Sequence, residues 1–298
     1  MKSTKNKSMK MNFLKSRNQL PLIAACTFLA LTLSSCRNND EDADIDTNKY
    51  IELTVHDDSL GKEVTFTGEY TGNIFADLDN NGKIDPNEKL TKNDKDYFYF
   101  TATNKKTKIY GEFKSIFTPK SFQNTDLTKY SSLRKVRHAG PGTITVDANN
   151  NIEHLSLYNN PNPTFDFSPY KKATTIYYNK GLLEKADFSQ NPALEFVDVS
   201  NNQLASLTFA KNKNLTRIDC YLNFISEAQM QLTVNSIGNK VPGTVTYIVP
   251  YAVNYPNKID KNVMTKAQVA QMSAKGWDSQ YLEFQGENYT IGHGFEGL

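Results

Sequence analysis

The sequence has little of several features that would assign it to a common functional class. It holds only three cysteines in 298 residues, which is too few for a disulfide framework. Its histidines are scattered, and no two of them stand at the spacing of a metal-binding pair: His56, His138, His154 and His293. It contains no G-x-S-x-G motif, no glycine-rich phosphate loop and no H-E-x-x-H motif. From these absences we expect a protein that is not an enzyme.

A surplus of basic residues is also missing. Six of the 34 lysines and arginines lie in the first 35 residues, which contain no acid, so the remainder carries 28 basic and 32 acidic residues. A net charge of −4 on that remainder argues against binding to a nucleic-acid backbone. The aromatic content, 17 Phe and 16 Tyr, is high enough to fill a core and excludes a wholly disordered chain.

The N-terminal apolar run is too short for a membrane-spanning helix, which needs about 20 residues. It covers 14 residues, 20–33, behind a basic segment, and this combination predicts a signal peptide over residues 1–35. The run ends in Leu33-Ser34-Ser35-Cys36, which resembles the lipobox of bacterial lipoproteins. The resemblance implies cleavage before Cys36 and attachment of lipid to its thiol, so that the lipid alone holds the protein to the membrane. The alternative is a secretory signal with an incidental cysteine.

An acidic segment follows Cys36. We interpret residues 36–48 as a solvated tether, because they are rich in Asp, Asn and Glu and almost free of apolar residues. An acidic stretch directly behind the lipidated cysteine is similar to the surface-export signal of Bacteroidetes lipoproteins. The resemblance implies an outer membrane lipoprotein that is exposed at the cell surface.

An internal repeat of 21 residues dominates the middle of the chain. Apolar residues recur at three places in each copy: Ile152, Ala173, Leu194 and Leu215; Leu155, Ile176, Val197 and Ile218; and Leu157, Tyr178, Val199 and Cys220. Two further positions recur on the same period: Asn160, Gly181, Asn202 and Asn223, and then Phe167, Phe188 and Phe209. The alternation predicts a short strand with one face in the core, followed by an Asn turn and a Phe that fills the return side. Because one copy cannot bury its own face, the copies must stack into a solenoid.

Each copy matches L-x-x-L-x-L-x-x-N-x-L and so resembles the leucine-rich repeat. We therefore predict a mixed β-rich α/β fold, with a leucine-rich repeat solenoid over residues 112–237. Short strand-like segments predict a small β domain over residues 49–111. A capping box at Ser226 predicts a short helix after the last repeat, and a second capping box at Thr265, between strand-like segments at 244–249 and 281–284, predicts a strand–helix–strand cap over residues 238–285. The tail, residues 286–298, has no clear prediction. With the lipobox, the Ile109-Tyr110-Gly111 lead-in and the cap from Val269 to Trp277, the chain resembles secreted leucine-rich repeat lipoproteins of Bacteroidetes.

A twelve-residue acidic segment lies inside the small β domain. Its oxygen-bearing residues and its glycine match the positions of a calcium-binding loop, with candidate ligands Asp77, Asp79, Asn81, Lys83, Asp85 and Glu88. We expect a calcium ion here to be structural rather than catalytic. The neighbouring segments look like strands instead of helices, so the alternative is an acidic Asn-Asn-Gly hairpin turn.

The repeat also predicts which side chains point out of the sheet. The outward positions carry an aromatic residue in every full copy, and the candidate partner-binding residues are His154, Tyr158, Tyr177, Phe196, Asp198, Arg217, Asp219 and Tyr221. Exposed aromatics beside Arg and Asp have the composition of an interface, although cross-strand aromatics can also serve to stabilise a sheet. The expected function is binding of a protein or glycan through this face. The alternative is a structural or assembly lipoprotein of the cell envelope.

Overall fold

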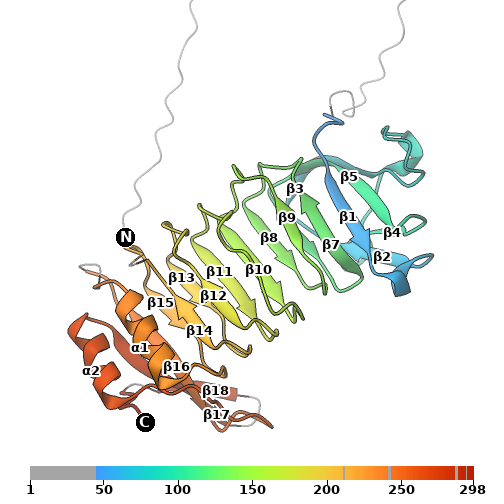
Figure 1. The fold of residues 1–298 in the computed structure, drawn as a ribbon. Helices are drawn as coiled ribbons and strands as arrows, with labels where there is room; N and C mark the ends of the chain where they lie inside the picture. Colours follow the sequence, from blue (N-terminus) through green and yellow to red (C-terminus); the bar gives the residue numbers. More distant parts are fainter. Residues whose placement is uncertain (1–44, 211, 241–242, 286–287, 293) are drawn as a thin grey trace, which may run out of the picture. The chain divides into compact units, whose positions relative to one another are not determined.

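The computed structural model describes residues 45–210, 212–240, 243–285, 288–292 and 294–298 (Figure 1). All of them belong to one compact unit. The predicted signal peptide, Cys36 and most of the acidic tether lie outside the described residues. Within the described part, no helix combines the length and the apolar character needed to cross a membrane.

A nine-stranded sheet forms one side of a β-solenoid of about five turns. Its strands are, in sheet order, β6 (Ser115–Thr118), β8 (Lys135–His138), β10 (His154–Tyr158), β11 (Thr175–Asn179), β13 (Phe196–Asp198), β15 (Arg217–Asp219), β16 (Tyr247–Val253), β17 (Asp278–Gln285) and β18 (Asn288–Gly292). All neighbours pair in parallel except β17 and β18. From β10 to β15 the register advances by 21 residues per strand without a shift, so the sequence repeat is one turn of the solenoid.

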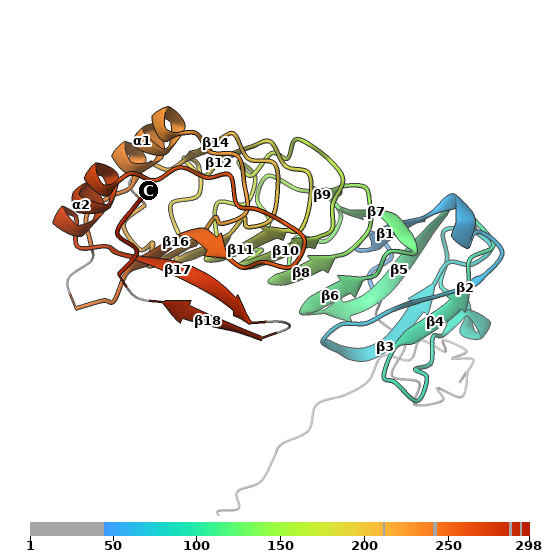
Figure 2. The ribbon, with the colours of Figure 1, turned by 90° about the horizontal axis from the view of Figure 1, so that it is seen from below.

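The repeated apolar positions form the interior of the solenoid. All twelve residues of the three apolar sets are at most 3 % exposed. Cys220 is among them, and burial raises the pKa of its thiol, which suits a small core residue rather than a reactive one. On the return side, β12 (Lys185–Asp187) pairs with β14 (Ser206–Thr208), and Figure 2 shows these strands and the helices on the opposite side of the core from the nine-stranded sheet.

A left-handed residue ends each strand of the repeat, and in three of the four copies a buried asparagine follows it. Asn202 donates from Nδ2 to the carbonyl oxygens of Tyr178 (2.6 Å) and Val199 (3.1 Å), and its Oδ1 accepts the N–H of Leu183 (3.2 Å). Asn223 repeats this arrangement one turn later. The residue before each of these turn positions has φ between +54° and +57°: Asn159, Lys180, Asn201 and Leu222. The asparagine thus satisfies backbone groups that the bend removes from the ladder.

The N-terminal strands continue into the solenoid. A second sheet has the order β3-β5-β1-β7-β9. Its members are β1 (Ile51–Val55), β3 (Tyr70–Ala76), β5 (Lys106–Phe113), β7 (Phe122–Leu127) and β9 (Ile144–Val146), and β2 (Glu63–Phe66) pairs with β4 (Phe98–Thr101) beside them. The ladder between β1 and β7 crosses the boundary that we place at residues 111 and 112, and one apolar core spans both parts. Tyr130 reinforces the junction, because its hydroxyl donates to the Gly111 carbonyl oxygen (2.8 Å).

Two helices and the last strands close the C-terminal end. Helix α1 (Glu227–Ser236) starts at Ser226 and α2 (Lys266–Ala274) at Thr265, which confirms both predicted N-caps. The strand expected at 244–249 instead forms over Tyr247–Val253, because parallel pairing with β15 fixes where it begins. The unassigned tail contributes β18, which pairs antiparallel to β17. Two short 3-10 helices, η1 (Asp57–Ser59) and η2 (Pro86–Glu88), lie in the N-terminal part.

The inward-facing His138 makes stability depend on pH. It is fully buried on β8, its Nδ1 lies 2.7 Å from the Thr118 hydroxyl, and burial lowers its pKa to about 4. Between pH 6.5 and 4 the unfolded chain therefore binds a proton that the folded chain does not, so this contribution to stability is lost as the pH falls. We expect the free energy of unfolding of the wild type, relative to a His138→Gln variant, to fall by about 3 kcal/mol from pH 7 to pH 4.

Urea denaturation of both proteins across this pH range measures that difference. The comparison also cancels the contribution of Asp219 and Asp260, because both proteins contain them. Burial raises the pKa values of these two carboxyls to about 6, so their contribution to the free energy of unfolding changes with pH in the opposite direction to that of His138. A constant difference between the two proteins at all pH values would show that His138 titrates like an exposed histidine.

Candidate functional site

The outward side chains of the nine-stranded sheet form rows across the strands, and we call this surface the strand face. Because the strands are parallel and in register, equivalent positions of successive turns stand side by side. One row contains Lys135, His154, Thr175, Phe196, Arg217 and Tyr247. The next row contains Phe117, Arg137, Ser156, Tyr177, Asp198 and Asp219.

A pocket of about 600 Å³ opens on the strand face over β6, β8, β10 and β11. Thr67 and Gly68, which follow β2, form part of its wall, because Thr67 bridges to Phe117 on β6. The outward side chains that line it are Ser115, Phe117, Lys135, Arg137, His154, Ser156, Tyr158, Tyr177 and Asn179. The pocket therefore combines aromatic rings, hydroxyl groups and exposed basic groups on a rigid parallel sheet.

Basic side chains at this pocket lie against aromatic rings. The Arg137 guanidinium lies 4.7 Å from the centroid of the Phe117 ring, and Lys180 Nζ lies 5.0 Å from that of Tyr158. Such contacts hold a flexible cation in place without neutralising it. The pocket end of the strand face consequently presents positive charge beside apolar rings.

Two carboxylates of the strand face, those of Asp198 and Asp219, are engaged by their neighbours. Asp198 accepts hydrogen bonds from Ser200 Oγ (2.6 Å) and Asn179 Nδ2 (2.7 Å). Asp219 accepts from the Arg217 guanidinium, with Nη2 2.6 Å from Oδ2, yet burial raises the pKa of its carboxyl to about 6. They are 9 % and 4 % exposed, respectively. Both carboxylates therefore order the surface around them and offer little area to a partner.

The structure brings together some of the predicted partner-binding residues. His154, Tyr158 and Tyr177 line the pocket, and Phe196 packs edge-on against Tyr177 with ring centroids 5.0 Å apart. Arg217 continues the series, with its guanidinium 4.8 Å from the centroid of the Phe196 ring. Tyr221 lies outside the pocket, half-buried beside the cluster of Leu222, Val249, Ala252 and Leu282.

Sequence reasoning missed four residues of the pocket wall, namely Thr67, Gly68, Ser115 and Phe117. Thr67 and Gly68 come from the N-terminal strands, and no local pattern links them to the repeats. The sequence did contain a signal for Phe117, because its neighbours Ile116 and Thr118 both face inward and the strand precedes the clear repeats.

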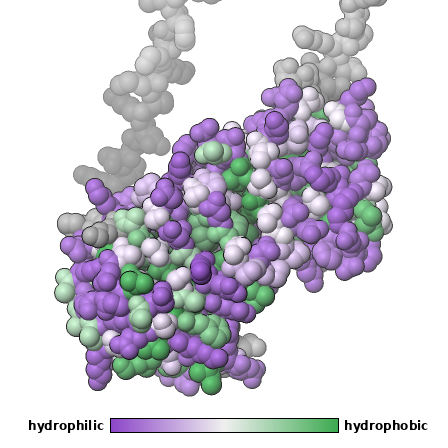
Figure 3. All heavy atoms as spheres, in the orientation of Figure 1, coloured by the Kyte–Doolittle hydropathy of each residue, from purple (hydrophilic) through white to green (hydrophobic). Residues whose placement is uncertain are grey.

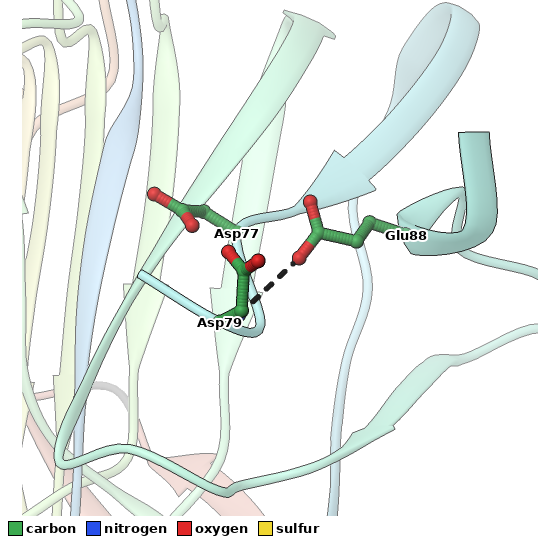
Figure 4. Close-up of side chains that lie close together, drawn as sticks. All are labelled: Asp77, Asp79 and Glu88. Carbon is green, nitrogen blue, oxygen red and sulfur yellow. Dashed lines mark hydrogen bonds between the residues drawn. The ribbon is translucent and has the colours of Figure 1, made fainter. Parts of the chain in front are cut away.

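The predicted metal loop connects β3 to η2. It brings together Asp77, Asp79 and Glu88, one carboxylate oxygen of each lying within 4.8 Å of the others (Figure 4). Asn81 and Asp85 stand next to them, with Asn81 Nδ2 donating to Asp79 Oδ2 (2.9 Å) and Asp85 Oδ2 (2.8 Å). The N–H of Lys83 donates to Asn81 Oδ1 (2.7 Å), which folds the loop back on itself.

No family model matches the chain, and neither a curated protein nor a solved structure matches it.

The surface opposite the strand face differs from it in character. There, hydrophilic residues predominate over β1–β5, and apolar residues are scattered over the solenoid and its C-terminal end (Figure 3). Leu182 and Phe224 are exposed apolar residues outside the strands, 44 % and 43 % exposed, and each follows the strand of its turn.

Proposed function

We propose that this protein is a non-enzymatic binding module that holds a protein or glycan partner against the strand face. The pocket over β6–β11 carries the proposal, since it places rings and basic groups side by side on hydrogen-bonded strands of one sheet. Aromatic and arginine side chains at the centre of a concave surface are the groups that contribute most to binding in known interfaces. Tyr177 and Phe196 supply the ring surface, and Lys135 and Arg137 supply the charge.

We further propose that the solenoid is of the leucine-rich repeat type and that Cys36 anchors it by lipid to the outer membrane. The 21-residue register and the buried asparagines at the strand ends support the repeat type. The lipobox and the acidic tether support an anchored module facing outward. In this arrangement the tether separates the strand face from the membrane.

Removing the two central rings tests the binding site. We expect a Tyr177→Ala/Phe196→Ala double variant to lose at least tenfold in affinity for its partner, as is typical when central aromatic residues are truncated. The free energy of unfolding should fall by no more than about 2 kcal/mol, because both side chains are half-exposed. Wild type and variant are compared on arrays of glycans and extracellular host proteins, and hits are quantified by surface plasmon resonance.

The matched control is a Leu182→Ala/Phe224→Ala double variant, which removes two exposed apolar side chains away from the strand face. It should bind like the wild type. Equal binding by the Tyr177→Ala/Phe196→Ala variant would show that the partner sits elsewhere.

Orientation in the envelope separates this function from an assembly role inside the envelope. Intact cells are treated with an external protease, with a periplasmic protein as control. If the protein faces outward, as we propose, the protease cleaves it while the periplasmic control stays intact. Cleavage only after lysis would favour the assembly role.

A further inference from the structure

We propose that the loop of residues 77–88 binds a calcium ion and that this ion completes the N-terminal part of the fold. This site is separate from the pocket and independent of the function proposed for it. The inference rests on how the loop is anchored, on carboxylate oxygens that are buried without a partner, and on the chemistry of the donor set.

The loop is held at both ends by the surrounding sheet. The N–H of Asp77 donates to the Lys108 carbonyl oxygen on β5 (2.9 Å), and that of Leu90 donates to the Ile74 carbonyl oxygen on β3 (2.7 Å). The Leu78 carbonyl oxygen accepts from Thr103 Oγ1 (2.9 Å) and Asn104 Nδ2 (2.7 Å). The carboxylates at positions 77 and 88 are thus fixed close together by the fold.

Two of these carboxylates are buried with unsatisfied oxygens. Asp77 is 0 % and Glu88 3 % exposed. Asp77 Oδ2 accepts the N–H of Gly82 (3.0 Å) and Glu88 Oε1 accepts that of Leu78 (2.6 Å), but Asp77 Oδ1 and Glu88 Oε2 have no hydrogen-bond partner. A buried charge without compensation is costly, and three converging carboxylates also repel one another. A bound cation removes both penalties.

Gly82 shapes the loop around its carboxylates. Gly82, at φ +76°, directs its N–H toward Asp77 and lets the chain turn tightly around the carboxylates. These features orient the oxygens toward one another.

The donor set selects the cation. The ligand atoms that these side chains can offer a cation are oxygens: the carboxylates of Asp77, Asp79, Asp85 and Glu88, and the amide oxygen of Asn81, whose Nδ2 donates to Asp79 and Asp85. In a twelve-residue calcium loop the seventh position, which is Lys83 here, contributes its backbone carbonyl oxygen. Oxygen-only donors suit hard cations, and six or more of them from one flexible loop suit calcium better than the smaller magnesium ion, which keeps most of its water.

Titration of the purified full chain with calcium, after treatment with a chelator, tests this site. We expect binding at submillimolar calcium by isothermal titration calorimetry. The melting temperature should rise by about 5 °C or more between chelator and millimolar calcium, because the ion binds the folded state alone. Asp77→Asn and Glu88→Gln should each abolish the heat and the shift. Asp94→Asn, in an exposed neighbouring loop, should respond like the wild type.

The variants also distinguish a binding defect from misfolding. In chelator, Asp77→Asn should melt at or above the wild-type temperature, because it removes an uncompensated buried charge. Identical melting of the wild type with and without calcium, with no heat of binding, would overturn the proposal. An equal response to millimolar magnesium would overturn the assignment to calcium.

Discussion

Replacing Phe188 by alanine is expected to lower the free energy of unfolding by about 4 kcal/mol. Its side chain is fully buried on the return side of the solenoid, with ring centroids 4.6 Å from Phe167 and 5.7 Å from Phe209. The neighbouring rings belong to the turns before and after it, whose spacing the sheet fixes. The cavity left by the substitution therefore cannot close. Equilibrium denaturation in urea measures the loss.

Two further variants show whether the loss comes from the cavity. Phe188→Leu keeps most of the volume and should cost about 1.5 kcal/mol. Phe224→Ala removes an exposed ring and should change stability by less than about 1 kcal/mol. If Phe188→Ala were no more harmful than Phe224→Ala, the column of phenylalanines would not be part of the stabilising core.

Replacing Asn202 by alanine is expected to cost about 3 kcal/mol, although it removes little apolar area. The side chain is 1 % exposed and bonds backbone groups of two successive turns, including the carbonyl oxygen of Tyr178 and the N–H of Leu183. Alanine leaves these groups buried without partners, and no water replaces the amide in a closed core. Urea denaturation gives the free energy, and hydrogen exchange should show faster exchange at the Leu183 N–H.

An exposed asparagine serves as the control for this substitution. Asn149→Ala, in the turn after β9, should alter stability by less than about 0.5 kcal/mol. Asn202→Asp separates the two halves of the interaction, because it keeps the acceptor for Leu183 and loses the donor to Tyr178. Equal stability of Asn202→Ala and Asn149→Ala would mean that the buried amide does not support the turns.

The solenoid interior was predictable because its information is local and repeated. Alternation within each 21-residue unit indicated which residues point inward, and the structure buries Ala173, Tyr178 and Cys220 at positions where a leucine would be usual. The helix starts at Ser226 and Thr265 were predictable for the same reason, since capping depends on a few adjacent residues. The acidic loop was recognisable from spacing alone.

The features that could not be predicted from the sequence depend on contacts between residues that are far apart in the chain. The pocket wall at Thr67 exists only because a segment near β2 pairs with β6, about 50 residues later. Lys180 and Leu222 adopt a left-handed conformation that their side chains do not favour, because the stacked turns before and after impose it. The unsatisfied oxygens of Asp77 and Glu88 likewise appear only once the surrounding sheet buries them.

The unshifted register between β10 and β15 has a consequence for how such proteins diverge. Neighbouring strands lie about 4.8 Å apart, so gaining or losing one unit of 21 residues changes the length of the strand face by one such step. Each side chain keeps its direction, and the N-terminal strands and the C-terminal helices remain as end pieces. Evolution can therefore change the number of units in whole steps, which lengthens or shortens the strand face while the pocket at one end stays unchanged.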